Sequence, residues 1–577
     1  MNFELNLTIE ELEKRTNKDF LIRKPMLNID SKEYNELNTG DKEALKHLVK
    51  AAQYANTIYM KQDNELNIPF LHFLEEEIKK GNKQAELTKI LFDAQLGIIG
   101  IDSESKKVIL LKDAKELEGK AFYPSDLKKE ELHNILKTML KNGEKSEVEK
   151  ILNQRTIVKR DNEKLKAVDY TQEFKEEFNK IADELIKASE VSTNKDFNEY
   201  LILQAEALRK NDPMLDAKAD KKWASLQDTP LEFTISREQY ADLLTGSVIE
   251  DEELKNLLEK EGITAISKDS IGIRVGIVNN KGTQDLLKVK KYLPIMAENM
   301  PYKERYEQNI SSEEDNLQTM VDVDIVSLRG DEGSYRGGIT IAQNLPNNDK
   351  LSLTIGGGRR NVYHRQVRTN NSEEAIERRK KRLNATLKES LHKFYNPEAD
   401  HWFTIGHENV HSLGPKNGTE ALGKYKNIIE ENKADMGSIA LLDCLVKQGV
   451  YTEEEKKQIL VTFAANCFLK AKPELSQAHR VRTVMQAFYF IKEKAISIDE
   501  NGIIDIDIEK MIPTAYKMLS EIIEVQLSKD FNCGEKFIND YFHWTDEINK
   551  VSIKLKEIDK SLNGMIITPL ADYLIKE

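Results

Sequence analysis

The sequence predicts a mostly helical α+β protein made of two lobes. Its length of 577 residues exceeds what one hydrophobic core supports, so two lobes or domains are expected. Long segments place apolar residues at helical spacing, and short segments rich in β-branched residues and glycine interrupt them. The chain is 39% hydrophobic and 32% charged, which is typical of folded globular proteins rather than disordered or membrane proteins.

Helical spacing dominates the first part of the chain. Apolar residues recur with a helical period from 31 to 80 and again from 87 to 94. Between 97 and 111 the period shortens around a polar turn, which predicts a β-hairpin. Residues 130 to 217 then return to long amphipathic helices. A small sheet element is therefore expected among helices.

Strand-like segments come later in the chain. Residues 231 to 278 and 337 to 355 contain short runs of β-branched residues and glycine, which predict strands of one small sheet or barrel. After Glu373 the pattern is helical to the end, and three prolines are expected to mark breaks in it: Pro415, Pro473 and Pro513. The sequence contains no internal repeat and no low-complexity linker.

The charge of the chain disfavours nucleic acid as a partner. The formal net charge is -13, whereas binding to the phosphate backbone rewards clustered Lys and Arg. One basic run, 378 to 382, is a local exception. Because glutamates flank it at helical spacing, we interpret it as a solvated helix face rather than an RNA site.

Cysteine usage and hydropathy favour a cytoplasmic protein. The three cysteines lie far apart without a CxxC pair, so we expect reduced structural thiols rather than disulfides or a thiolate metal site. The first residues show no basic start followed by an apolar run, so no secretory signal is expected. Apolar stretches such as 439 to 446 are far shorter than the roughly 18 residues of a membrane-spanning helix, so no membrane partner is expected.

The segment from His407 to His411 has the pattern HExxH. On a helix, residues four apart lie on the same face, so both imidazoles can reach one metal ion. Glu408 follows the first histidine, where its carboxylate can take a proton from water at that ion. The alternative is a helix whose two histidines only cap or pack, and a third ligand distinguishes the two.

Glu431 is the candidate third ligand. Catalytic zinc sites of the two-histidine and one-glutamate type take their carboxylate from another element. Glu431 follows a Gly- and Pro-containing turn at 414 to 418 and lies on a helix expected to start at about Thr419. Asp435, four residues later, shares its face and can accept the N–H of a ligating imidazole. The alternative for 430 to 435 is an ordinary acidic helix surface.

Several stretches together resemble one known family. They are His407 to Pro415, Glu420 to Gly423, Glu430 to Asp435, Gly119 to Pro124, and Asp196 to Leu208 followed by Trp223. Through these stretches, which are spread along nearly the full length of the chain, the sequence resembles the dipeptidyl peptidase III family of M49-type zinc metallopeptidases. It is especially similar to the branch associated with plant Nudix hydrolases.

The resemblance implies a fold and an activity. It implies two lobes around a wide cleft, with a helical lobe carrying one zinc ion (Zn²⁺) and another lobe holding a small β-barrel plus helices. We expect 1–295 to form the barrel lobe, completed by about 335–355, and 296–577 to form the catalytic lobe. The implied function is zinc-dependent hydrolysis of short peptides, releasing dipeptides or small N-terminal fragments.

The resemblance also implies site residues. Its motif places Glu430, with Asp435, around the ligands. Asn344-Leu345-Pro346-Asn347 is similar to the family's Asn-x-Pro-Asn strand, so the amides of Asn344 and Asn347 are expected to hold the peptide backbone and amino terminus. His479 matches a histidine that stabilises the oxyanion, and Arg482 is a candidate for gripping a substrate carbonyl or carboxylate.

The sequence also departs from the family pattern. The best-known members carry HExxGH, whereas this chain has the five-residue form. The family's Glu-x-Tyr segment, which binds the free amino terminus, is expected near 276 to 281, where the chain has Val278-Asn279-Asn280-Lys281 instead. No Nudix box is present, so nucleotide hydrolysis is not expected. Two alternatives stay open: a catalytically silent peptide-binding or regulatory protein, and a zinc hydrolase of a non-peptide amide.

Overall fold

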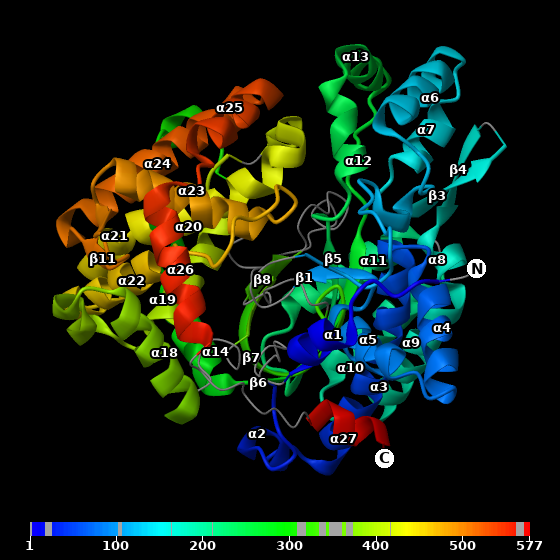
Figure 1. Ribbon diagram of the computed structural model, residues 1–577, viewed down its shortest axis with the longest axis horizontal. Helices are drawn as coiled ribbons and strands as arrows, with labels where there is room; N and C mark the ends of the chain where they lie inside the picture. The colour runs from blue at the N-terminus through cyan, green and yellow to red at the C-terminus, as the bar shows by residue number, and fades with distance from the viewer. Residues whose placement is uncertain are drawn as a thin grey trace.

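The structure is a computed structural model of the full chain. It describes residues 3–17, 26–101, 107–162, 164–210, 212–308, 319–333, 342–345, 360–364, 373–415, 417–560 and 570–576. The fold is mostly helical with one small curled sheet and forms two lobes, as the sequence predicts (Figure 1). None of the described helices combines the length and apolar composition that crossing a bilayer requires.

The first lobe holds helices from the N-terminal half and, in addition, the last helix of the chain. Its helices are α1 (Ile9–Thr16), α2 (Lys32–Asn35), α3 (Thr39–Asp63), α4 (Asn67–Lys79), α5 (Lys83–Gln95), η1 (Lys120–Phe122), α6 (Lys129–Lys141), α7 (Lys145–Ile151), α8 (Tyr170–Glu173), α9 (Lys175–Val191), α10 (Lys195–Arg209), α11 (Pro213–Ser225), α12 (Leu243–Gly246), η2 (Ser247–Glu250), α13 (Glu252–Glu261) and α27 (Leu570–Lys576). Capping residues fix where two of these helices begin: Thr8 and Glu11 form a capping box at the start of α1, and Asp212 caps α11 directly before Pro213.

The second lobe is almost wholly helical. Its helices are α14 (Asn280–Lys290), α15 (Leu293–Glu298), η3 (Lys303–Arg305), α18 (Glu373–Thr386), η5 (Glu389–Phe394), α19 (Ala399–His411), η6 (Thr419–Tyr425), α20 (Lys426–Ala440), α21 (Leu442–Lys447), α22 (Glu453–Asn466), α23 (Ala478–Lys492), α24 (Ile508–Ser528), α25 (Phe531–Tyr541) and α26 (Asp546–Lys560).

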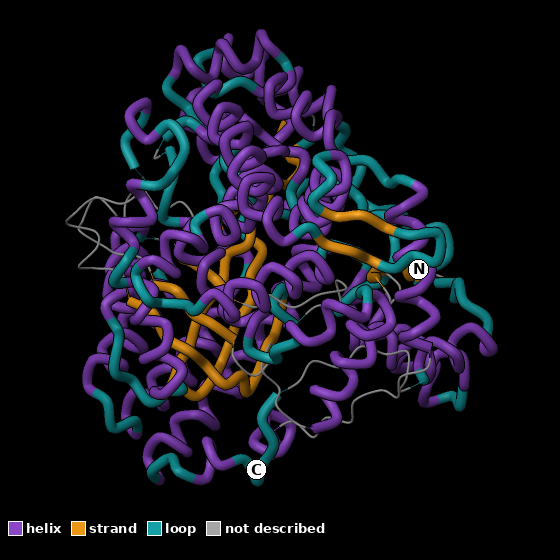
Figure 2. The backbone as a smooth tube through the Cα atoms, turned by 90° about the vertical axis from the view of Figure 1, so that its left-hand side faces the viewer, coloured by secondary structure: helices purple, strands orange, loops and turns teal. Residues whose placement is uncertain are grey.

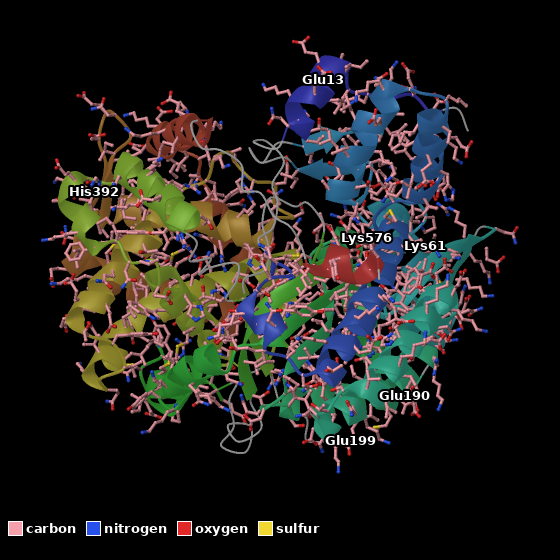
Figure 3. All side chains as sticks on the ribbon, turned by 90° about the horizontal axis from the view of Figure 1, so that it is seen from below. Glu13, Lys61, Glu190, Glu199, His392 and Lys576 are labelled. Atoms are coloured by element: carbon pink, nitrogen blue, oxygen red, sulfur yellow. The ribbon has the colours of Figure 1, made fainter. Side chains whose placement is uncertain are left out.

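Charged side chains of the first lobe, such as those of Glu13, Glu190 and Glu199, project from the periphery of the molecule (Figure 3). The same view shows helix α27, which carries Lys576; this helix packs against α3.

Figure 2 draws the strands of the chain in orange among the purple helices. The main sheet has the strand order β5-β6-β7-β9-β8. Its strands are β5 (Leu231–Glu238), β6 (Ser270–Val278), β7 (Thr319–Gly330), β8 (Ala342–Leu345) and β9 (Arg360–His364), and all neighbours are antiparallel except β7 and β9. Three two-stranded hairpins complete the described strands: β1 (Ile99–Ile101) with β2 (Lys107–Ile109), β3 (Thr156–Asp161) with β4 (Lys164–Asp169), and β10 (Ile496–Ile498) with β11 (Ile504–Ile506).

The sheet joins the hydrophobic cores of the two lobes. Along β7, Val321 and Val323 belong to the core of the first lobe, whereas Met320 belongs to the core of the second. This division follows from the alternation of side chains along a strand. In β9, Val362 and Tyr363 divide between the two cores in the same way. The sheet is therefore packed on both faces and fixes the two lobes to each other.

The structure confirms some predicted elements and corrects others. The hairpin between 97 and 111 is β1 and β2, and the helices after Glu373 form as predicted. The hairpin of β3 and β4 interrupts the segment 130 to 217, which the sequence analysis assigned to helices alone. Strands β7 and β9 were also missed, although in β7 Val321, Val323 and Ile325 alternate with Asp322 and Asp324, and all five are buried.

One predicted break is wrong: Pro513 lies inside α24. The helix continues through it, with Met511, Ala515 and Met518 buried on one face. Proline costs least near a helix start, and this packing stabilises the remaining turns. Of the predicted strand segment 337 to 355, only β8 lies within the described residues.

Two helices of the second lobe, α19 and α20, approach each other unusually closely. A Cβ atom on Gly406 of α19 would lie 2.3 Å from Ser438 Oγ, and one on Gly437 of α20 would lie 2.5 Å from Val410 Cγ1. Ser438 Oγ also donates a hydrogen bond to the carbonyl oxygen of Phe403 at 2.8 Å. Glycine at these two positions lets the two backbones pack together, so the relative placement of α19 and α20 depends on it.

Replacing Gly437 by alanine tests this close approach. The added methyl group meets Val410, so G437A should lower the free energy of unfolding by about 1–3 kcal/mol, as overpacking does. Gly534, inside α25, is the matched control, since its added Cβ would meet side chains no closer than 3.4 Å. G534A should leave stability level or raise it slightly. Chemical denaturation of the three proteins measures both changes, and equal stability of G437A and the parent would contradict the packing argument.

Candidate metal centre

Two adjacent helices supply the predicted ligands. The HExxH segment occupies the last turns of α19, and Glu431 lies in the second turn of α20. Between them the chain turns at Gly414 and Gly418, with φ of 91° and 94°, a conformation that glycine adopts without a steric penalty. The predicted turn is thus present, although the segment from Thr419 is the 3-10 helix η6 and the α-helix starts at Lys426.

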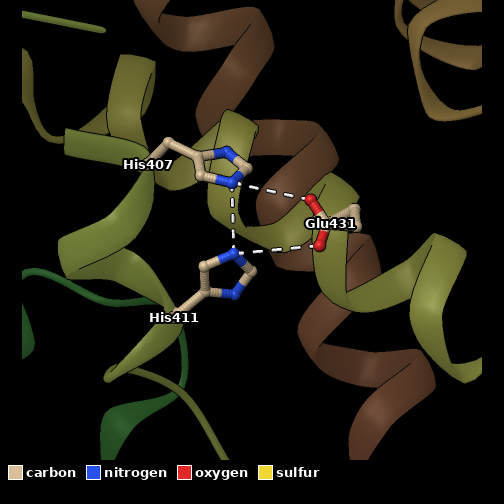
Figure 4. Close-up of side chains that lie close together, drawn as sticks. All are labelled: His407, His411 and Glu431. Carbon is tan, nitrogen blue, oxygen red and sulfur yellow. Dashed lines mark hydrogen bonds and ion pairs between the residues drawn. The ribbon is translucent and has the colours of Figure 1, made fainter. Parts of the chain in front are cut away.

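The three side chains converge on one point (Figure 4). One possible ligand atom from each of His407, His411 and Glu431 lies within 4.8 Å of the other two. The two Nε2 atoms are 3.1 Å apart, and the glutamate oxygens lie 3.5 Å from His407 Nε2 and 3.9 Å from His411 Nε2. Two nitrogens and one carboxylate of this kind form the donor set of a catalytic zinc site.

A carboxylate contacts the Nδ1 atom of each of the two histidines, on the opposite side of the ring from the metal cluster. His407 Nδ1 lies 2.7 Å from Asp435 Oδ1, and His411 Nδ1 lies 2.9 Å from Glu430 Oε1. With a carboxylate on each Nδ1, the two Nε2 atoms are directed at each other. Without a metal, a proton on one Nε2 joins the two rings, since Glu430 and Glu431 outweigh burial and raise the pKa of His411. A divalent cation bound to both nitrogens would take the place of that proton. The residues present therefore fit a divalent metal ion.

Further side chains orient these carboxylates. Asp435 Oδ2 accepts a hydrogen bond from Gln486 at 2.9 Å and lies 3.0 Å from Arg482 Nε. Glu430 Oε2 accepts from Gln526 at 3.0 Å. Side chains of α23 and α24 therefore hold Asp435 and Glu430 in place, and the roles of both residues beside the ligands stay predictions.

Burial and charge shift the acidities of the site in different directions. Burial lowers the pKa of His407 to about 4 and raises the pKa of Glu408 to about 7. Burial opposes ionisation of Glu430 as well, but Lys433 and His411 outweigh it and lower its pKa to about 2. For Glu431 the charges of His479, His411 and Arg482 likewise overcome burial and hold the pKa well below its ordinary value.

Glu408 lies at the metal cluster but is not part of it. Its Oε1 atom is 3.8 Å from His407 Nε2 and its side chain is buried. A buried carboxylate whose pKa lies near neutrality can exchange a proton at ordinary pH, which is the property of a general base. The role of Glu408 as the general base stays a prediction.

Arg482, predicted to grip substrate, and His479, predicted to stabilise the oxyanion, both contact Glu431. Arg482 Nη1 donates to Glu431 Oε2 at 2.6 Å, so its guanidinium bridges Glu431 and Asp435. His479 Nδ1 is 3.1 Å from the same glutamate oxygen, and its side chain is 50% exposed. The predicted roles of Arg482 in gripping substrate and of His479 at the oxyanion stay predictions.

Comparisons with known proteins agree with this architecture. The solved structure of DPP III from Caldithrix abyssi matches 97% of this chain and 100% of its own, with a TM-score of 0.75 and 22% identity. That of dipeptidyl-peptidase III from Corallococcus sp. strain EGB matches 98% of each chain, with a TM-score of 0.81 and 20% identity. The chain has the dipeptidyl peptidase III fold.

Sequence comparison adds one relative. Nudix hydrolase 3 of Arabidopsis thaliana is 23% identical over 425 residues, which cover 72% of this chain. The match spans only 50% of that relative, so this chain corresponds to about half of its length. No protein-family model matches the sequence.

A Glu-x-Tyr sequence lies at the end of β5, away from the position 276 to 281 where the family's segment is expected. Residues 276 to 278 are the last three of β6, whereas Glu238 is the last residue of β5 and Gln239 and Tyr240 follow it. Tyr240 donates a hydrogen bond to Glu431 Oε1 at 3.3 Å, and its ring centroid lies 5.4 Å from that of His479. The motif was visible in the sequence, but only the strand order shows that the end of β5 reaches the metal cluster.

Glu238 sits among other acids at this position. Burial raises its pKa well above the ordinary value, and the charges of Glu332, Asp331 and Glu431 raise it further. A buried carboxylate beside other carboxylates favours an incoming cation.

The predicted asparagines are less completely described. Asn344 lies in β8, where its backbone pairs with Asn361 of β9, but its side chain is outside the described residues. Asn347 lies outside them entirely. Their roles stay predictions.

Replacing Glu430 by glutamine should change the acid sensitivity of the metal-free protein. Because the folded pKa of Glu430 is about 2, below the unfolded value, its ionised form stabilises the fold above about pH 4.5. That contribution should be lost as pH falls towards 2. The Tm of the chelator-treated parent should therefore exceed that of E430Q at pH 6, and the difference should shrink between about pH 4.5 and 2. A difference that does not depend on pH would contradict the assignment.

Proposed function

We propose that this chain is a zinc-dependent peptidase that hydrolyses short peptides and releases dipeptides or small N-terminal fragments. One observation carries the proposal: His407, His411 and Glu431 place their ligand atoms within 4.8 Å of one another, with Glu408 beside them. The dipeptidyl peptidase III fold of the solved neighbours supports it.

The residues have separable roles in this reaction. His407, His411 and Glu431 would hold the ion, which when bound supplies Lewis acidity and promotes ionisation of water. Glu408 would accept the proton of the attacking water and pass it to the departing amine, for which a pKa near neutrality is suited. The half-exposed side chain of His479 supports its proposed role as a donor to the oxyanion.

The sheet offers a place for the peptide. Among the described strands, β8 ends the order of the main sheet, and it packs alongside α19. A peptide added to that edge as a further strand would run past the metal cluster, held mainly through its backbone. Asn344 and Asn347 would anchor it there, as the sequence predicts.

Replacing Glu408 by glutamine should abolish turnover without removing the metal. Loss of the general base should reduce kcat by at least about 100-fold, whereas zinc content should stay at the parental level because Glu408 is not a ligand. Turnover is measured by mass spectrometry of a set of short peptides incubated with the protein, with and without chelator. Zinc content is measured by elemental analysis. E398Q, at the other end of α19, is the matched control and should retain activity.

The same assay separates the alternatives. Zinc retained by the parent with no cleavage of any peptide would favour a peptide-binding or regulatory protein. Cleavage of non-peptide amides alone, detected in the products of a cell extract, would favour another hydrolase.

Glu238 should determine the preference for a free amino terminus. A carboxylate among other acids would pair with the terminal ammonium group, so the parent should cleave free peptides in preference to N-acetylated ones. E238Q should raise KM for free peptides by about 10- to 100-fold, which corresponds to one charge-assisted hydrogen bond. Glu253, exposed on α13 in the same lobe, provides the control E253Q. Equal cleavage of free and acetylated peptides by the parent would contradict dipeptide release.

A further inference from the structure

One charged residue next to the metal cluster has no role in the proposed reaction. Lys433 lies in α20, two residues after Glu431, and only 2% of its surface is exposed. At this spacing its side chain leaves the helix on a different face from Glu431, and it shares a face with Glu430 three residues earlier. Burying a charged ammonium group is costly unless polar partners surround it, so the partners of Lys433 indicate its role.

Lys433 makes two strong polar contacts. Its Nζ atom lies 2.8 Å from Glu430 Oε1 and donates a hydrogen bond to the carbonyl oxygen of Leu413 at 2.6 Å. Leu413 follows His411 by two residues, where the end of α19 favours a positive charge. Gly414 covers the aliphatic part of the lysine: a Cβ atom there would lie 3.1 Å from Lys433 Cδ. One side chain therefore connects α20 with the end of α19.

The Glu430 contact leads directly to a metal ligand. The oxygen that meets Lys433 Nζ, Oε1, is the one that accepts the Nδ1 proton of His411 at 2.9 Å. Glu430 thus lies between a cation and an imidazole, with Gln526 holding its second oxygen. Without the ammonium group of Lys433, the partly buried Glu430 carboxylate would lose much of the positive charge that offsets the cost of burying it. Its orientation would also no longer be fixed.

We propose that Lys433 is a positioning residue of the metal centre, which fixes Glu430 against His411 and thereby directs His411 Nε2 at the ion. This inference rests on the proposed function, because it presupposes that His411 is a ligand. Partners of ligating imidazoles commonly change metal affinity by about 10- to 100-fold when they are removed, and Lys433 would act one contact further out.

Two substitutions separate this role from simple stabilisation of the fold. K433M removes both polar contacts, whereas K433Q keeps a donor for the Leu413 carbonyl but removes the charge beside Glu430. Lys268 is the matched control: it is also fully buried, in the first lobe, and donates to the carbonyls of Ile151 and Asn153. K268M should lower Tm and leave the zinc affinity of the second lobe unchanged.

The experiment measures the Kd for Zn²⁺ of the full chain by competition with a chromophoric chelator, together with the Tm of the metal-free proteins. K433M and K433Q should both raise the Kd by about 10-fold or more, and K268M by less than about twofold. In an E430Q background, K433M should change the Kd by less than about twofold, because both residues act through one contact. If K433M does not fold, K433Q gives the same answer.

The outcomes distinguish this inference from the proposed function. Parental zinc affinity in K433M and K433Q, with a lowered Tm, would overturn the positioning role and leave the proposed function intact. An equal effect of K433M with and without Glu430 would overturn the route through that carboxylate. Failure of the parent chain to bind zinc would overturn the proposed function and this inference with it.

Discussion

The close packing of α19 against α20 is the constraint on which the candidate site depends. Gly406 and Gly437 remove the side chains that would separate the two helices, and Ser438 joins them by a hydrogen bond to the Phe403 carbonyl. Only at this separation do two imidazoles from one helix and a carboxylate from the other reach the same point. Because nearly all of α20 from Glu431 onward is buried, neighbouring helices hold it in place.

This packing has an electrostatic consequence. It concentrates the buried carboxylates of Glu408, Glu431 and Asp435 beside the partly exposed Glu430, where uncompensated charge is costly. Arg482 and Lys433 supply two cations at fixed positions, and the imidazoles supply hydrogen bonds. The remaining demand is for positive charge at the point where the Nε2 atoms meet. A divalent ion satisfies it, so the geometry and the charge balance lead to the same conclusion.

The sequence predicts the metal cluster well because the relevant spacings are local. HExxH fixes His407 and His411 on one helix face, and Gly414 and Gly418 make the return to Glu431 predictable. Residues brought by distant elements were harder to find. Tyr240 reaches Glu431 only through the placement of β5, and Gln526 reaches Glu430 only through the packing of α24. Likewise, β7 was missed: its residues 321 to 325 alternate between apolar side chains and aspartates, and only the fold shows that both sets are buried.

The most direct test is to locate zinc in crystals of the zinc-loaded chain by anomalous diffraction at the zinc absorption edge. One strong peak per chain is expected, bounded by His407 Nε2, His411 Nε2 and the Glu431 carboxylate. Glu430 and Asp435 should still accept hydrogen bonds from the Nδ1 atoms of the two histidines. A peak elsewhere, or a Glu431 side chain turned away from an ion held by the two histidines, would contradict it.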